Sequence, residues 1–336
     1  MTETAPLPRI AVIGTGGTIS SVGRDSLDIA TYTDTGEKYE VDELLAQFPE
    51  TGRVAELLPI RYRAVGSRAI GPAEWLELHR LIHETAAADP AIAGVVVTHG
   101  TSTLEETAYF LNLTVKLDIP VVLVGAQRPA SALSTDAGLN LVNAIRTAGA
   151  PGSRGRGVLV VLNDEIHAAR EVTKTSTLRL HTFKSPDFGP LGHADADRIA
   201  YYRAPLRRHA PDTVFDVQGR DSLPRVDIAM SYAGSDGAAV DAFVAASAEG
   251  IVSAGLLPGF ATAAELEALD RAVDKGIIVV QSVRNGSGRL VTVKTGRPKS
   301  CVLADNLTPP KARILLMLAL TATRNEVEIQ GMFGTY

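Results

Sequence analysis

The segment VVVTHGTSTLEETAYFL, residues 95–111, decides the fold class. It begins with a β-branched apolar run, passes through a polar Thr-Ser-Thr turn and continues with apolar residues at helical spacing. A short apolar strand that leads directly into a helix is the unit of a parallel sheet covered by helices. The hydroxyl residue at the turn, Ser102, is followed three residues later by Glu105, so the spacing also predicts a capping box with Ser102 as the helix N-cap.

Strands of the same kind recur in the first part of the chain. Residues 74–86 and 137–148 carry apolar side chains at helical spacing and are predicted as the connecting helices. The other apolar runs are RIAVIG (9–14), IPVVLVG (119–125) and GVLVVLND (157–164). We therefore predict an α/β fold with a doubly wound parallel sheet in a large N-terminal domain, residues 1–200.

A second and shorter series of strands follows a polar stretch punctuated by prolines, residues 201–224, which we predict to be a linker. The series comprises VDIAMSY (226–232), GIVSAGL (250–256), IIVVQSV (277–283) and the helix-like PKARILLMLALT (310–321). This pattern predicts a smaller α/β C-terminal domain, residues 225–336, which completes a two-domain chain.

Composition and charge narrow the classes of function. The chain has 336 residues, 45% of them hydrophobic, and a formal charge of −5 with 33 basic residues scattered among 38 acidic ones. No basic stripe indicates a nucleic-acid partner, and no apolar run is long enough to span a bilayer. The N-terminal sequence has no apolar signal region, and the only cysteine is Cys301. We expect a cytoplasmic protein without disulfides or a cysteine-based metal site.

The loop after the first predicted strand, GTGGTIS (14–20), is rich in glycine. A dinucleotide-binding Gly-x-Gly-x-x-Gly motif would need glycine at Ile19, and no Gly-Lys-Ser/Thr phosphate loop is present. The loop offers two hydroxyls, Thr15 and Thr18, and exposed backbone amides. The structural alternative is a tight turn that needs glycine for its dihedral angles.

Two later loops pair a hydroxyl with an amine. Thr101 follows the strand at residues 95–98, and Lys174 lies among hydroxyl residues in the segment 170–175. The carboxyl ends of parallel strands meet at one edge of the sheet, where ligands bind. A threonine hydroxyl becomes a good nucleophile only when a base removes its proton, and a desolvated lysine can serve as that base. The alternative for Lys174 is a solvated surface lysine.

Four motifs together resemble the bacterial-type L-asparaginases and glutaminase-asparaginases. They occur in the same order over nearly the whole chain, at residues 14–20, 95–129, 158–192 and 307–321. The resemblance implies a large N-terminal and a smaller C-terminal α/β domain. It also implies a homotetramer with each active site between the N-terminal domain of one subunit and the C-terminal domain of another, and no metal or organic cofactor.

The resemblance also implies roles for individual residues. Thr18 matches the family's nucleophile, and Thr101 with Lys174 matches its proton-handling pair. Tyr32 matches the tyrosine that assists the nucleophile, with Tyr39 as a competitor. Residues expected to bind the substrate are Ser67, which matches the serine that holds the α-carboxylate, and Arg68, Gly100, Ser102 and Ala126. The implied reaction is acyl transfer from a small carboxamide, with backbone amides near the glycine-rich loop or Ala126 polarising the carbonyl oxygen.

Several positions depart from the family's pattern. The family has aspartate where this chain has Ser102, and a polar uncharged residue where it has Arg68. In the C-terminal domain Gly234 replaces an expected asparagine, and the segment that ends with Arg289 and Leu290 lacks the expected acidic residue. An ammonium group without a paired carboxylate is penalised by desolvation and by a nearby guanidinium.

These departures leave alternatives beside hydrolysis of L-asparagine. The first is an amidase for a carboxamide that lacks a free α-amino group. The second is a non-catalytic paralogue that binds a small ligand, although the nucleophile and lysine are both retained. A subunit of a tRNA-dependent amidotransferase is less favoured, because that relative carries an extra N-terminal domain and the first strand here begins at Arg9.

Overall fold

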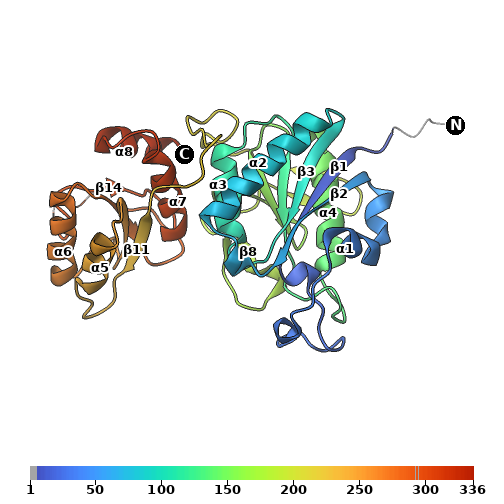
Figure 1. The fold of residues 1–336 in the computed structure, drawn as a ribbon, viewed down its shortest axis with the longest axis horizontal. Helices are drawn as coiled ribbons and strands as arrows, with labels where there is room; N and C mark the ends of the chain where they lie inside the picture. Colours follow the sequence, from blue (N-terminus) through green and yellow to red (C-terminus); the bar gives the residue numbers. More distant parts are fainter. Residues whose placement is uncertain (1–5, 292, 294) are drawn as a thin grey trace. The chain divides into compact units, whose positions relative to one another are not determined.

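The computed structural model describes residues 6–291, 293 and 295–336. The chain forms two compact units (Figure 1), one ending at Thr213 and the other beginning at Val214. This division falls inside the stretch 201–224 that the sequence indicates as a linker.

The first unit contains an eight-stranded sheet in the described part of the chain, with the order β10-β9-β6-β5-β4-β3-β1-β2. Its strands are β1 (Arg9–Gly16), β2 (Glu56–Val65), β3 (Ile92–Thr98), β4 (Val121–Val124), β5 (Val158–Leu162), β6 (Glu165–Ala168), β9 (Gly192–Ala194) and β10 (Ile199–Tyr201). The strands from β2 to β5 are parallel, as predicted, whereas β6, β9 and β10 add an antiparallel extension.

Helices cover both faces of this sheet (Figure 1). They are α1 (Val41–Gln47), α2 (Pro72–Ala88), α3 (Leu104–Thr114) and α4 (Ala137–Gly149), so both helices predicted from periodicity are confirmed. One hydrophobic cluster joins α1 and α4 to alternate residues of β1, among them Ile10 and Val12. On the α2–α3 side Trp75 stacks on Phe110, with ring centroids 5.5 Å apart. The alternation of side chains along each strand thus supplies an apolar surface to both helical layers.

A short hairpin stands apart from the main sheet. It consists of β7 (Thr173–Lys174) and β8 (Phe183–Lys184), which pair antiparallel. Single 3-10 turns occur in the loops as η1 (Thr18–Ser20), η2 (Tyr32–Thr35), η3 (Pro49–Arg53), η4 (Ser67–Ala69), η5 (Pro151–Ser153) and η6 (Leu180–Thr182). Three of them, η1, η2 and η4, carry residues that the sequence singles out.

The second unit is a smaller α/β layer structure. In the described residues it has a parallel sheet of β11 (Val226–Met230), β12 (Gly250–Gly255), β13 (Ile278–Val283) and β14 (Val302–Leu303). Its helices are α5 (Ala238–Ala245), α6 (Ala263–Asp274), α7 (Pro309–Ala319) and α8 (Glu326–Thr335). Residues of α5 and α6 pack with β11, β12 and β13 in one hydrophobic cluster, which confirms the predicted α/β C-terminal domain.

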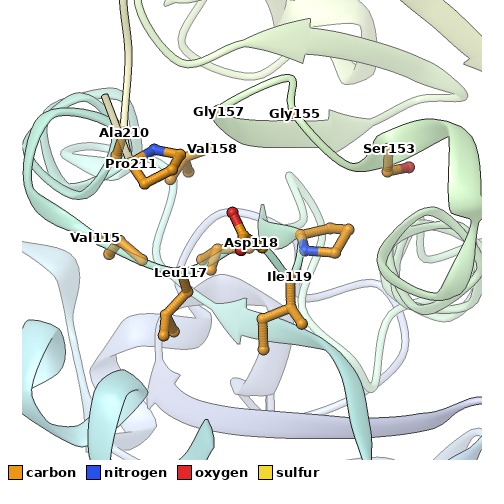
Figure 2. Close-up of a pocket in the computed structure, with 12 residues that line it drawn as sticks. Val115, Leu117, Asp118, Ile119, Ser153, Gly155, Gly157, Val158, Ala210 and Pro211 are labelled. Atoms are coloured by element: carbon orange, nitrogen blue, oxygen red, sulfur yellow. The ribbon is translucent and has the colours of Figure 1, made fainter. Parts of the chain in front are cut away.

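A small hollow in the first unit lies at the amino-terminal edge of its sheet (Figure 2). Val121 and Val158, which begin β4 and β5, both line it. The lining is mainly apolar, and Asp118 is its only ionisable side chain. The predicted site residues follow the opposite ends of the strands, so this hollow is not the candidate site.

Candidate active site

Three loops meet in backbone contact at the carboxyl edge of the first sheet. Gly17 has a φ of +86°, and a Cβ built on it would lie 2.2 Å from the Cα of Gly100. A Cβ on Gly100 would lie 2.8 Å from the Cβ of Ser67. A larger residue at either position would force these loops apart, so both glycines allow the close approach, and Gly17 also supplies the positive φ of its turn. The contact brings together the loops that carry Thr18, Ser67 and Thr101.

The two hydroxyls of the first loop have different surroundings. Thr15 is 1% exposed and donates a hydrogen bond to the carbonyl oxygen of Thr98 at 2.8 Å, so it holds β1 to β3. Thr18 is half-buried, and its Oγ1 lies 2.9 Å from the hydroxyl oxygen of Tyr32. Tyr39 instead packs against the hydrophobic core. The structure therefore brings Tyr32 to Thr18 and leaves Thr15 a structural role.

Thr101 and Lys174 meet although they lie 73 residues apart. The Nζ of Lys174 donates to the Oγ1 of Thr101 at 2.7 Å, and Thr101 donates onward to the Oε1 of Gln127 at 3.0 Å. The amide nitrogen of Gln127 faces the carbonyl oxygens of Thr177 and Arg179, which directs its Oε1 toward Thr101. Gln127 follows Ala126 in the loop after β4, and no motif in the sequence identifies it as a partner of Thr101.

The environment of Lys174 favours loss of its proton. Burial lowers the pKa of this amine, and the carboxylate of Glu105 opposes the shift. Glu105 also accepts a hydrogen bond from the backbone N–H of Lys174 at 3.1 Å, so it fixes the lysine in position. A lysine with a lowered pKa can accept a proton from a neighbouring hydroxyl.

Ser102 does not cap α3, so the predicted capping box is wrong. The helix begins at Leu104 with Thr103 at the N-cap, and Ser102 is an exposed residue of the preceding turn. The hydroxyl of Thr103 donates to the carbonyl oxygen of Ser67 at 2.9 Å, and Glu105 turns toward Lys174. These long-range partners outcompete the local cap that the spacing indicates.

The other expected binding residues surround this junction. Ser67 is 7% exposed at the start of η4, and its neighbour Arg68 is exposed. Ala126 is fully buried; a Cβ on Gly125, the residue before it, would lie 2.9 Å from Thr101 Cγ2. The loop after β4 therefore presses against Thr101.

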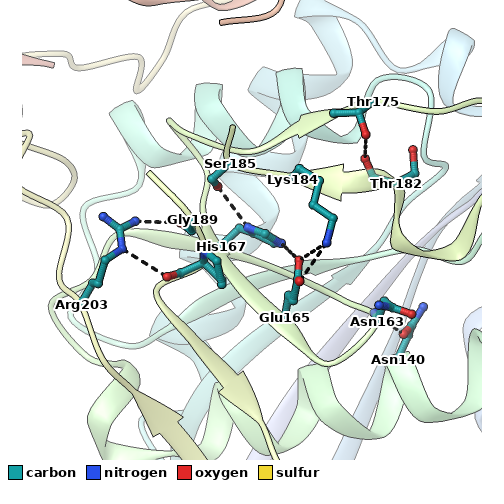
Figure 3. Close-up of polar contacts among 11 residues, drawn as sticks. Asn140, Asn163, Glu165, His167, Thr175, Thr182, Lys184, Ser185, Gly189 and Arg203 are labelled. Atoms are coloured by element: carbon teal, nitrogen blue, oxygen red, sulfur yellow. Dashed lines mark hydrogen bonds and ion pairs between the residues drawn. The ribbon is translucent and has the colours of Figure 1, made fainter. Parts of the chain in front are cut away.

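A polar network holds the hairpin that carries Lys174 (Figure 3). Lys184, opposite Thr173 in the hairpin, donates to both oxygens of Glu165 on β6 at 2.8 and 2.9 Å. His167 lies 3.2 Å from Glu165 and 3.0 Å from the hydroxyl of Ser185. Hydrogen bonds from His167 and Lys184 lower the pKa of Glu165 to about 2. The network ties β8, and through it β7, to the main sheet.

The structure also gives the surroundings of the residues in the second unit that depart from the family pattern. Gly234 is exposed with a φ of +82°, and a Cβ on it would meet no atom within 4 Å. Arg289 is exposed, whereas Leu290 is buried in its own unit. In the part of the chain that the structure describes, no group of three or more histidine, cysteine, aspartate or glutamate side chains could hold a metal ion. No helix among those residues is long and apolar enough to cross a membrane.

Comparisons with known proteins define the class. The family model "Asparaginase, N-terminal" matches residues 9–207, and "Glutaminase/Asparaginase C-terminal domain" matches residues 225–333. The chain therefore belongs to the asparaginase family, a class of amidohydrolases.

Individual relatives agree with this assignment. L-asparaginase 2 of Bacillus subtilis is 43% identical over 99% of this chain and 88% of its own length. L-asparaginase 2 of Escherichia coli is 41% identical over 98% of this chain and 94% of its own. A crystal structure of a probable cytoplasmic L-asparaginase from Campylobacter jejuni, 38% identical, superposes with a TM-score of 0.92 over 98% of this chain and 99% of that one.

Proposed function

We propose that the protein hydrolyses L-asparagine to L-aspartate and ammonia, with Thr18 as the nucleophile. The proposal rests on one observation: two threonine hydroxyls each contact a different polar partner, and the loops that carry the two threonines are in contact. Thr18 contacts Tyr32, and Thr101 contacts Lys174, while the backbones of Gly17 and Gly100 bring the two pairs together. Relatives named L-asparaginase or glutaminase-asparaginase support this substrate class.

The proposed chemistry proceeds in two steps. The Thr18 oxygen attacks the carboxamide carbon, its proton passes to the neighbouring groups, and the leaving nitrogen takes up a proton and departs as ammonia. Water then attacks the resulting ester and releases the acid and the threonine hydroxyl. Tyr32 orients the Thr18 hydroxyl, and Lys174 takes and returns a proton through Thr101. Backbone amides near the glycine-rich loop, residues 14–20, or at Ala126 polarise the carbonyl oxygen.

A second candidate substrate is a carboxamide without a free α-amino group. Arg68 follows the proposed α-carboxylate residue, Ser67, and Ser102 precedes Thr103, whose hydroxyl donates to the Ser67 carbonyl oxygen. Both side chains are exposed, so neither is needed to hold the fold. A guanidinium and a neutral hydroxyl are poor partners for an ammonium group. Succinamate and N-acetyl-asparagine test this candidate against L-asparagine.

Assembly and location complete the proposal. We propose a homotetramer in the cytoplasm, in which the second unit of a neighbouring subunit completes each site. Light scattering during gel filtration measures the mass of the assembly, and a monomer with full activity would contradict this part.

The test is ammonia release from L-asparagine, D-asparagine, L-glutamine, succinamate and N-acetyl-asparagine. We expect L-asparagine to give the highest kcat/KM. A preference for succinamate and N-acetyl-asparagine, which have no free amine, would favour the second candidate substrate over L-asparagine. No release from any of them would reject both. Ser102→Asp sharpens the comparison, because a restored carboxylate should lower KM for L-asparagine but not for succinamate.

A further inference from the structure

A buried imidazole stands directly behind the junction of the three loops. His99 is the first residue after β3 and precedes Gly100, and its side chain is fully buried. Its Nδ1 lies 2.8 Å from the carbonyl oxygen of Gly100, and its Nε2 lies 3.0 Å from the Oγ1 of Thr107. Thr107, on α3, also accepts a hydrogen bond at 2.9 Å from the indole Nε1–H of Trp75 on α2.

The chemistry of these groups fixes the direction of every hydrogen bond. A carbonyl oxygen can only accept, so His99 Nδ1 carries a proton and donates it to Gly100. Burial lowers the pKa of His99 to about 4, so the ring is neutral near pH 7 and its Nε2 is an acceptor. The Thr107 hydroxyl therefore donates to Nε2, and its oxygen accepts from the indole N–H of Trp75, which can only donate.

The accepting carbonyl belongs to the peptide that joins Gly100 to Thr101. The orientation of this peptide determines the position of the Thr101 hydroxyl relative to the Lys174 amine. Gly100 also lies against Gly17 and Ser67 so closely that an added Cβ would overlap both loops. Movement of this peptide would therefore reach Thr18, Ser67 and Thr101 together.

We propose that Trp75, Thr107 and His99 form a hydrogen-bond relay that holds the Gly100–Thr101 peptide in its working orientation. His99 is a positioning residue in this account, since its side chain is buried behind the loops. The catalytic part of the inference rests on the proposed function, whereas the hydrogen-bond directions do not.

The test compares Thr107→Val with Thr107→Ser. Valine keeps the volume and removes the hydroxyl, whereas serine keeps the hydroxyl. We expect Thr107→Val to lower kcat by about 10- to 100-fold with a change in KM of less than about threefold, because a misplaced catalytic group costs rate. Thr107→Ser should stay within about threefold of the wild-type kcat. A Thr107→Val enzyme with wild-type kcat would overturn the positioning role.

Two readouts are independent of turnover. Nitrogen-15 NMR of the histidine ring should show His99 with its proton on Nδ1 in the wild type, and the opposite tautomer would overturn the relay itself. Trp75 is the only tryptophan, so the tryptophan fluorescence of the protein reports on the bond from Trp75 to Thr107. This fluorescence should change in Thr107→Val, which lacks the hydroxyl, and not in Thr107→Ser. Should Thr107→Val not fold, Trp75→Phe tests the outer end of the relay. It removes the indole N–H together with part of the buried ring, so it should leave the His99 proton on Nδ1 and reduce kcat. A wild-type kcat in this variant would overturn the relay. If the wild type releases no ammonia while the Nδ1 tautomer is observed, the proposed function fails and the relay stands.

Discussion

The two threonines of the candidate site are chemically identical side chains in different surroundings. Thr18 is half-buried in a glycine-rich loop and contacts one phenol from η2. Thr101 is 5% exposed and is held between a lysine and a glutamine. Because Thr18 is accessible, it is suited to attack a substrate. Because Thr101 is enclosed between fixed partners, it is suited to transfer a proton over a fixed distance.

The strongest way to break this comparison is to remove each hydroxyl in turn. Thr18→Ala should lower kcat for L-asparagine by at least about 10³-fold, because the nucleophile is lost. Thr101→Ala should cause a loss of about 10²- to 10³-fold, because proton transfer is impaired but the nucleophile remains. Initial rates of ammonia release give both values. Thr33→Ala, an exposed threonine in the same region, is the matched control and should keep wild-type activity.

The pH dependence of activity tests the role of Lys174, the partner of the enclosed Thr101. The folded pKa of this lysine is lowered by burial, so activity that depends on the neutral amine should rise with pH through that lowered value. Stability should also rise with pH between the lowered folded pKa and the ordinary value of 10.5, since the unfolded chain binds more protons there. Lys174→Met should lower kcat by about 10²-fold or more and remove both dependences. An unchanged pH–rate profile would contradict the assignment.

Tyr32 tests the accessible half. Tyr32→Phe keeps the ring and removes the hydroxyl that contacts Thr18, and we expect kcat to fall by about 10- to 100-fold. Tyr39→Phe is the control, because Tyr39 packs against the core, and it should stay within about twofold of wild type. Equal losses in the two variants would mean that the contact at 2.9 Å does not serve the reaction.

The network behind Lys174 should be sensitive to acid. The folded pKa of Glu165 is about 2 against an ordinary value of 4.5, so its contribution to stability is present above 4.5 and is lost as pH falls toward 2. Glu165→Gln should reduce the free energy of unfolding at pH 7 by about 1 to 2 kcal/mol and flatten its acid dependence. Glu84→Gln, at an exposed position of α2, should leave the curve unchanged. Urea unfolding from pH 7 to 3 measures the difference.

The smallest effect concerns Ser102. Because it is not the N-cap of α3, Ser102→Ala should change the free energy of unfolding by less than about 0.5 kcal/mol, whereas loss of a true cap costs about 1 kcal/mol. A larger loss in a thermal or urea unfolding curve would restore the capping interpretation.

The sequence predicts those parts of the fold that follow from continuous patterns. Strands β1, β3, β4 and β5 are nearly uniformly buried, so their apolar runs are visible. Strand β2 contains only exposed and half-buried residues, and β9 and β10 have three residues each, so none of them gives such a run. A parallel strand that is buried on both faces gives a continuous apolar run, and such a run can be recognised in the sequence.

The candidate site was predictable where motifs carry it and not where single long-range contacts decide. Resemblance indicates Thr18, Thr101 and Lys174. It does not distinguish Tyr32 from Tyr39, and nothing local marks Gln127 as the acceptor from Thr101. These choices depend on which loops meet in space. The error at Ser102 has the same origin, because Glu105 has a distant partner that a local spacing rule does not include.

The most direct test of the central claim is to find the threonine that carries the acyl group. Wild-type enzyme is mixed with L-asparagine, quenched in acid during turnover, digested and examined by mass spectrometry, beside the Thr18→Ala and Thr101→Ala variants. We predict one aspartyl group on the peptide that contains Thr18 and none on the peptide that contains Thr101. An acyl group on Thr101, or hydrolysis of L-asparagine by Thr18→Ala at the wild-type rate, would contradict the account.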